Sequence, residues 1–187
     1  DYASLLVNNA SPMILADGSI APVQQAGAGL LNVKNAVTST IAVAPLSLSF
    51  GAGGSTIDNV KWFTVKNLGA EPASWTLAVA STDDAKPTLS SESVTLDPGA
   101  TADINLTFTT GGLKPGPYQG FVLVKDEAAG AEARVPYWYA VQSEPARITI
   151  VQSPTTVLRA GQTFTLLLRV HDASGVALSS PAPTLVP

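Results

Sequence analysis

The region that decides the fold begins with Val43-Ala44-Pro45-Leu46-Ser47-Leu48-Ser49-Phe50-Gly51 and ends with Arg134-Val135-Pro136-Tyr137-Trp138-Tyr139-Ala140-Val141. Between these two stretches, short apolar runs are separated by clusters of Gly, Pro and Asp roughly 8–12 residues apart. This spacing is typical of an antiparallel β-sandwich. The same region contains all three Trp residues and three of the four Tyr residues. It therefore has the bulky side chains that a sandwich core needs.

The apolar runs predict an all-β fold of about seven or eight strands, the number expected for an immunoglobulin- or fibronectin type III-like sandwich. The clearest alternation places Ile104, Leu106 and Phe108 on one face of a strand. The run 118–125 is apolar on both faces, which indicates a central strand covered on both sides. The strands are expected at residues 41–51, 58–67, 73–81, 88–90, 94–96, 103–109, 118–125 and 133–142.

The two flanks of this region follow different patterns. The first 40 residues do not alternate, and we expect only short helices there, near residues 1–10 and 30–37. The last segment contains two alternating runs, which are too few strands for a stable sheet on their own. We therefore interpret the chain as part of a longer protein, divided into residues 1–40, a sandwich at 41–143 and a partial second β-unit at 144–187.

Composition excludes several classes of function. Hydrophobic residues make up 45% of the chain and charged residues only 13%, which favours a packed core over disorder. The net charge of −4 argues against nucleic acid as a partner, because phosphate binding needs clustered Lys and Arg. The absence of Cys excludes disulfides, thiolate metal sites and a Cys nucleophile. No apolar run reaches the roughly 18 residues that a membrane span needs.

The single histidine, His171, is the first residue to test for hydrolase chemistry. A serine hydrolase brings Ser, His and an acid together, and Asp172 is the neighbour of His171. Adjacent residues of a strand point to opposite faces, so Asp172 is badly placed to orient the imidazole. The Gly-Xaa-Ser-Xaa-Gly turn of many hydrolases is also missing. We interpret His171 as a structural residue at a strand end.

Three further patterns point to loops rather than sites. Asp83-Asp84 and Asp126-Glu127 are interpreted as turns, because calcium needs six to eight oxygen ligands and no Asp-rich loop supplies them. Gly27-Ala28-Gly29 resembles the start of a dinucleotide fingerprint, but Asn32 occupies the position of the third glycine. No catalytic, cofactor-binding or metal-ligating residue is therefore predicted. Asn9-Ala10-Ser11 and Asn105-Leu106-Thr107 fit the glycosylation pattern, which is a weak signal.

The aromatic residues of the sandwich raise the question of a ligand platform. Their positions in alternating strands favour packing in the core or at its edge. In the last predicted strand, Trp138 lies opposite to its neighbours, and we expect its face to meet a neighbouring domain. The residues considered are Trp62, Trp75, Tyr118, Tyr137, Trp138 and Tyr139.

The flanks resemble a known family. Leu5-Leu6-Val7-Asn8-Asn9-Ala10-Ser11, followed by Gln24-Gln25-Ala26-Gly27-Ala28-Gly29-Leu30-Leu31-Asn32-Val33-Lys34-Asn35-Ala36-Val37, looks like the C-terminal end of a subtilisin-like serine peptidase domain. In that family a helix, a loop and a Gly-Ala-Gly segment lead to a short helix; here Asn9 replaces the usual Thr. Large secreted members continue into a fibronectin-like sandwich, which residues 41–51 and 135–141 resemble. Residues 145–178 are similar to the bacterial immunoglobulin-like repeats that follow.

This resemblance implies a secreted or cell-surface bacterial protein, but it brings no active site. The catalytic Asp, His and Ser segments of the family lie upstream of the part that residue 1 matches. The first hypothesis is thus a non-catalytic accessory domain that braces or spaces an upstream catalytic domain of the same polypeptide, or helps to hold a protein substrate.

A second resemblance gives the alternative. Pro45-Leu46-Ser47-Leu48-Ser49-Phe50-Gly51, Val65-Lys66-Asn67-Leu68-Gly69 and Leu96-Asp97-Pro98-Gly99 also resemble the major-sperm-protein and PapD-like sandwiches, which are interaction modules. The second hypothesis is therefore an adhesion or protein-binding module of a cell-surface protein.

Overall fold

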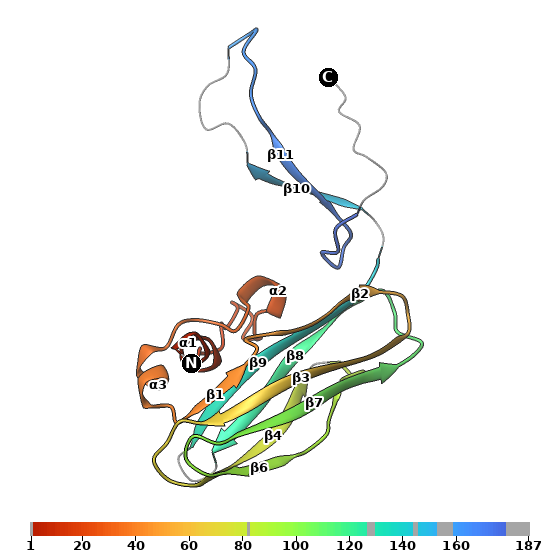
Figure 1. Ribbon diagram of the computed structural model, residues 1–187. Coiled ribbons are helices and arrows are strands. Elements are labelled where there is room, and N and C mark those ends of the chain that lie inside the picture. Colours follow the sequence, from red (N-terminus) through yellow and green to blue (C-terminus); the bar gives the residue numbers. More distant parts are fainter. Residues whose placement is uncertain (1, 82, 127–129, 144–145, 153–158, 179–187) are drawn as a thin grey trace.

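The computed structural model describes residues 2–81, 83–126, 130–143, 146–152 and 159–178. Two β-sheets pack against each other to form a sandwich (Figure 1). Together with the short N-terminal helices and a small extra sheet, this arrangement is an immunoglobulin-like β-sandwich, as the sequence predicts. One sheet has the order β1 (Ile41–Ala44), β3 (Ile57–Asn67), β7 (Thr101–Thr110), β5 (Thr88–Leu89). The other has the order β2 (Leu48–Gly53), β9 (Ala131–Val141), β8 (Gly116–Asp126), β4 (Ala73–Ser81), β6 (Ser93–Leu96).

The core lies between the two sheets and follows the predicted alternation. On β7, Ile104, Leu106 and Phe108 are all buried, and the ring of Phe108 meets two others edge-on. Its centroid lies 5.6 Å from that of Phe50 and 6.0 Å from that of Tyr139. Edge-on packing of this kind brings the positive rim of one ring against the negative face of the next. Three strands from both sheets are joined in this way.

The central position of the run 118–125 is confirmed. Strand β8 lies between β9 and β4, and Val122 and Val124 face the core. Phe121 points to the opposite face of the sheet and is also buried, under the N-terminal residues. Apolar residues on both faces of β8 are thus explained by layers on both sides.

The single strand expected at 41–51 is wrong. The chain forms β1 and β2 instead, in different sheets, and crosses between them at Pro45-Leu46-Ser47. The crossing lets Val43 enter the core from one sheet and Leu48 from the other. Strand β2 also runs parallel to β9, whereas the other pairs in the described sheets are antiparallel.

The flanks form three short helices and a separate hairpin. Helices α1 (Tyr2–Asn8), α2 (Val23–Ala26) and α3 (Val33–Thr38) lie beside β1 and β9 (Figure 1). Helices α1 and α3 correspond to the helices expected near 1–10 and 30–37, whereas α2 was not predicted. Strands β10 (Arg147–Gln152) and β11 (Leu167–His171) pair as an antiparallel sheet, and β11 is shorter than the predicted run 163–171. Within the described residues, no helix is long and apolar enough to cross a membrane.

Candidate functional site

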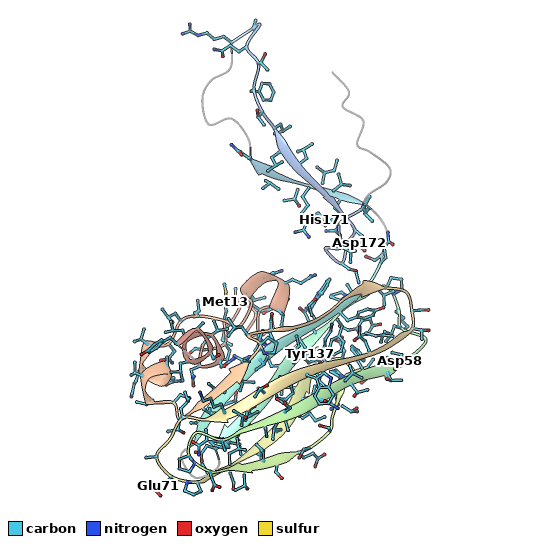
Figure 2. All side chains as sticks on the ribbon, in the orientation of Figure 1. Met13, Asp58, Glu71, Tyr137, His171 and Asp172 are labelled. Carbon is cyan, nitrogen blue, oxygen red and sulfur yellow. The ribbon has the colours of Figure 1, made fainter. Side chains whose placement is uncertain are left out.

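His171 lies at the end of β11 (Figure 2), and no acidic side chain among the described residues contacts its ring. Its Nε2 lies 2.7 Å from the Thr149 hydroxyl, and its Nδ1 lies 2.6 Å from the backbone carbonyl of Asp172. The Asp172 carboxylate instead accepts hydrogen bonds from the backbone N–H groups of Ser143, at 2.7 Å, and Val176, at 2.8 Å. Asp172 therefore fastens a turn to the end of the sandwich. His171 lies at a strand end, as the sequence predicts, and its structural interpretation remains a prediction.

We expect the chain of residues 1–187 to show no peptidase activity. The His171 ring is engaged by a hydroxyl and a carbonyl, so it has no carboxylate to stabilise an imidazolium during catalysis. Release of peptides from fluorescently labelled casein measures this directly. The His171→Ala variant is the control, and cleavage by the parent chain that this variant lacks would contradict the assignment.

The acidic and glycine-rich patterns also have structural explanations. Asp83 accepts a hydrogen bond from the backbone N–H of Gln119 at 3.4 Å, and Asp126 ends β8, while Glu127 lies outside the described residues. No group of three His, Asp or Glu residues in the described part of the chain could hold a metal ion. Asn32 caps α3, since its Oδ1 accepts from the Asn35 N–H at 3.1 Å. It therefore has a helix-capping role in place of the third glycine of a nucleotide-binding loop.

The aromatic residues divide between core and surface. Trp75, Tyr137 and Tyr139 are buried between the sheets, and Tyr118 packs at the edge of that core, as predicted. Burial raises the pKa of Tyr137 to about 12. Trp138 is half-buried on the opposite face of β9, which confirms its predicted orientation. For Trp62 the core prediction is wrong, because 62% of its surface is exposed.

The N-terminal helices are attached to the sandwich by a buried asparagine. Asn8, at the end of α1, is fully buried. Its Oδ1 accepts the backbone N–H of Val43 at 3.0 Å, and its Nδ2 donates to the carbonyl of Arg134 at 3.5 Å. Because one amide bridges β1 and β9, α1 is fixed in position relative to both sheets. Asn9 is buried too and donates to the Leu5 carbonyl, so the folded chain does not present its glycosylation pattern.

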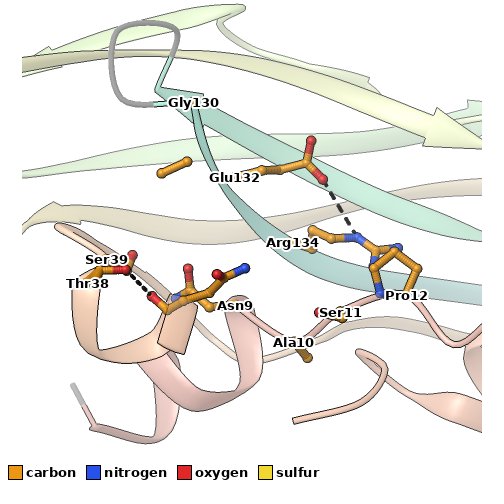
Figure 3. A pocket seen from close by; sticks show the side chains of 11 residues that line it. Asn9, Ala10, Ser11, Pro12, Thr38, Ser39, Gly130, Glu132 and Arg134 are labelled. Carbon is orange, nitrogen blue, oxygen red and sulfur yellow. Dashed lines mark hydrogen bonds and ion pairs between the residues drawn. The ribbon is translucent and has the colours of Figure 1, made fainter. Parts of the chain in front are cut away.

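A polar cavity of about 300 Å³ lies beside this attachment (Figure 3). Arg134, which is only 5% exposed, lines the cavity, and its guanidinium lies 3.9 Å from the centre of the Phe121 ring. Burial lowers the pKa of Arg134, while Glu132 opposes that effect, with 3.9 Å between Nε and Oε1. Since the N-terminal residues Asn9 and Ser11 form the other wall, the cavity marks the joint between the helices and the sandwich.

The outer side of the N-terminal segment exposes large apolar side chains. Nine of them lie within residues 1–40, whereas the described part of 41–143 has only Val60 and Trp62. Large exposed apolar patches on a protein surface are typical of interaction sites. We call this set the N-terminal apolar surface; it consists of Tyr2, Leu6, Met13, Ile14, Ile20, Leu30, Leu31, Val33 and Val37.

Comparisons with known proteins bear on the fold alone. No family model matches the sequence, and no curated protein matches it. Among solved structures, the chain is similar to the CsuC-CsuE chaperone–tip adhesion subunit complex of Acinetobacter baumannii, at 12% identity and a TM-score of 0.45. That match covers 56% of this chain and 58% of the other, so it spans less than two thirds of the matched protein.

Two further structures are similar over a comparable share of the chain. They are PapD-like domain 7 of human CEP192, at 15% identity and a TM-score of 0.42, and WR4, a C. elegans MSP family member, at 11% and 0.39. The matches cover 56% and 55% of this chain, and 85% and 98% of the others. Likeness at this level is limited to the immunoglobulin-like fold. The resemblance to subtilisin-like peptidases finds no support in these comparisons and remains a prediction.

Proposed function

We propose that the chain is a non-catalytic, protein-binding β-sandwich module that braces a neighbouring folded domain. The partner domain docks on the N-terminal apolar surface. The observation that supports this most directly is the distribution of exposed apolar side chains, which gather on residues 1–40 and are rare on the sandwich itself. Burying one such large side chain contributes about 1.5–3 kcal/mol. Covering several of them would hold two domains together.

The attachment of α1 makes this surface suitable for bracing. Asn8 fixes the helix to β1 and β9, so the apolar side chains on its outer side are held in place before a partner arrives. Pre-ordering of this kind lowers the entropy cost of association. A domain that docks on α1 and α3 would therefore be held rigidly relative to the sandwich.

We further propose that the neighbouring domain is the catalytic domain of a secreted subtilisin-like serine peptidase in the same polypeptide. The segments that resemble the end of such a domain, 5–11 and 24–37, contain Leu6, Leu30, Leu31, Val33 and Val37 of the N-terminal apolar surface. Five of the nine residues of the N-terminal apolar surface thus lie in the segments that resemble a peptidase tail. Secretion or display at the cell surface follows from the same proposal.

The test uses the longer polypeptide that contains the preceding domain. Changing Leu31 and Val37 together to Ser should shorten the half-life of casein-cleaving activity at elevated temperature at least about threefold, because two exposed anchors of the joint are lost. Val151→Ser, which changes another exposed apolar position, on β10, is the matched control and should leave the half-life unchanged.

Two outcomes are informative. An unchanged half-life in the double variant would contradict bracing through the N-terminal apolar surface. A preceding domain without peptidase activity would contradict the proposal that the neighbour is a peptidase, but it would not contradict bracing. In that case the adhesion or protein-binding module becomes the better description, and the same variants would be scored by the thermal stability of that other domain.

A further inference from the structure

The outward face of the four-stranded sheet has an exposed tryptophan at its centre. Trp62 points away from the core from the middle of β3, and its neighbour on the same face, Val60, is 42% exposed. In the register, Trp62 lies opposite Asn105 and Val60 lies opposite Thr107 of β7. These residues form a flat platform, since successive outward side chains of two paired strands lie side by side.

Two hydrogen-bonded Asp–Thr pairs flank the tryptophan along the strands. At one end the Thr109 hydroxyl donates to Asp58 at 2.8 Å, and at the other the Thr64 hydroxyl donates to Asp103 at 2.6 Å. Both pairs are directly opposite in the register of β3 and β7. Each threonine uses its proton on the carboxylate, so the exposed atoms of the pairs are mainly hydrogen-bond acceptors. Asp58 is labelled in Figure 2.

We propose that this β3–β7 face, made up of Asp58, Val60, Trp62, Thr64, Asp103, Asn105, Thr107 and Thr109, binds a β-1,4-linked glycan chain. A sugar ring lies flat on the Trp62 indole, and hydroxyl groups of the neighbouring sugars donate hydrogen bonds to Asp58 and Asp103. The site is separate from the N-terminal apolar surface, and this inference does not depend on the proposed function.

The chemistry of the face fits a glycan in two ways. The axial C–H groups of a sugar carry partial positive charge, and the negative face of an indole attracts them. Carboxylates accept hydrogen bonds, and so do threonine hydroxyls that already donate their proton elsewhere. The hydroxyl groups of a sugar supply the matching donors. A β-1,4-linked chain is extended and flat, so it can follow a strand and reach both Asp–Thr pairs.

Other ligands fit this face less well. On the outward side of β3 and β7, the carboxylates of Asp58 and Asp103 outnumber the single lysine, Lys66, so the phosphates of a nucleic acid are not favoured. A protein partner needs roughly 800 Å² on each side, with an apolar centre. Only two large apolar side chains are exposed on the described part of the sandwich, Val60 and Trp62. An exposed aromatic ring framed by polar groups is more suitable for an amphipathic ligand such as a sugar.

Native affinity electrophoresis tests the proposal with the chain of residues 1–187. Gels contain hydroxyethyl cellulose, soluble xylan or glycol chitin, each of which has a β-1,4-linked backbone. The chain should be retarded by at least one of them. Trp62→Ala should weaken that retardation about tenfold or more, and Asp103→Ala should weaken it less. Tyr2→Ala, which removes an exposed aromatic side chain from α1, is the matched control and should behave as the parent chain.

The thermal transition of Trp62→Ala shows whether this variant is folded. Trp62→Tyr is a second variant, which keeps an aromatic ring. Tyrosine at this position should preserve part of the retardation. The proposal is overturned if none of the three polysaccharides retards the parent chain, or if Trp62→Ala and Trp62→Tyr are retarded as strongly as the parent. Trp62-dependent binding of a protein without retardation by any glycan would also overturn it.

Discussion

Replacing Asn67 with Ala should lower the free energy of unfolding of the sandwich by about 3 kcal/mol, since three hydrogen bonds of a buried side chain, each contributing about 1 kcal/mol, are lost. Asn67 is fully buried at the end of β3. Its Nδ2 donates to the carbonyls of Glu71, at 2.9 Å, and Leu96, at 3.0 Å, and its Oδ1 accepts the Gly69 N–H at 2.8 Å. One side chain thus joins the end of one sheet to β6 in the other.

Chemical denaturation followed by circular dichroism measures this change, and the midpoint of thermal unfolding should fall by about 12 °C or more for a sandwich of this size. Glu71→Ala is the matched control, because its side chain is exposed in the same loop (Figure 2). A loss below about 1 kcal/mol for Asn67→Ala would mean that water replaces these bonds. The role of Asn67 as the link between the two sheets would then be wrong.

Replacing Asn8 with Ala should loosen the N-terminal helices while leaving the sandwich folded. The change leaves the buried Val43 N–H without its acceptor, which costs about 1–3 kcal/mol. The loss weakens the attachment of α1 to the sheets, because both hydrogen bonds of Asn8 connect α1 to a strand. Transient opening of the segment should therefore become about tenfold more frequent.

Trypsin measures this opening, since Lys34 lies in α3. Cleavage after Lys34 should be about tenfold faster in Asn8→Ala than in the parent chain, while the thermal midpoint of the sandwich stays within a few degrees. Asn35→Ala, which changes an exposed asparagine of α3, is the control and should not accelerate cleavage by a comparable factor. Equal cleavage rates in Asn8→Ala and the parent would show that α1 is held by other contacts.

The parts of the fold that depend on local periodicity could be predicted from the sequence. Ile104, Leu106 and Phe108 alternate with polar residues, and all three face the core. The pairing partner of a strand depends on distant residues, so no local pattern separates β1 from β2. Alternation in 41–51 looks continuous because Val43 and Leu48 both enter the same core, although from opposite sheets.

The polar residues that hold the structure together gave no signal in the sequence. Asn8 and Asn67 are two of several asparagines, and only the fold shows that both are buried and bridge separate strands. Arg134 lies in an apolar run, and its neighbours predict a strand. They do not predict that N-terminal residues cover its guanidinium. For Trp62, the position in an alternating strand favours the core or its edge. Its orientation depends on the register with β7, which the sequence does not specify.

Hydroxyl-radical footprinting of the longer polypeptide tests the central proposal most directly, because it measures the exposure of individual side chains. If a neighbouring domain docks on the N-terminal apolar surface, oxidation of Tyr2, Met13 and Leu31 should fall at least about threefold relative to the chain of residues 1–187. Oxidation of Trp62, on a separate face of the sandwich, should stay the same. Unchanged oxidation of Tyr2, Met13 and Leu31 in the longer polypeptide would contradict the proposal.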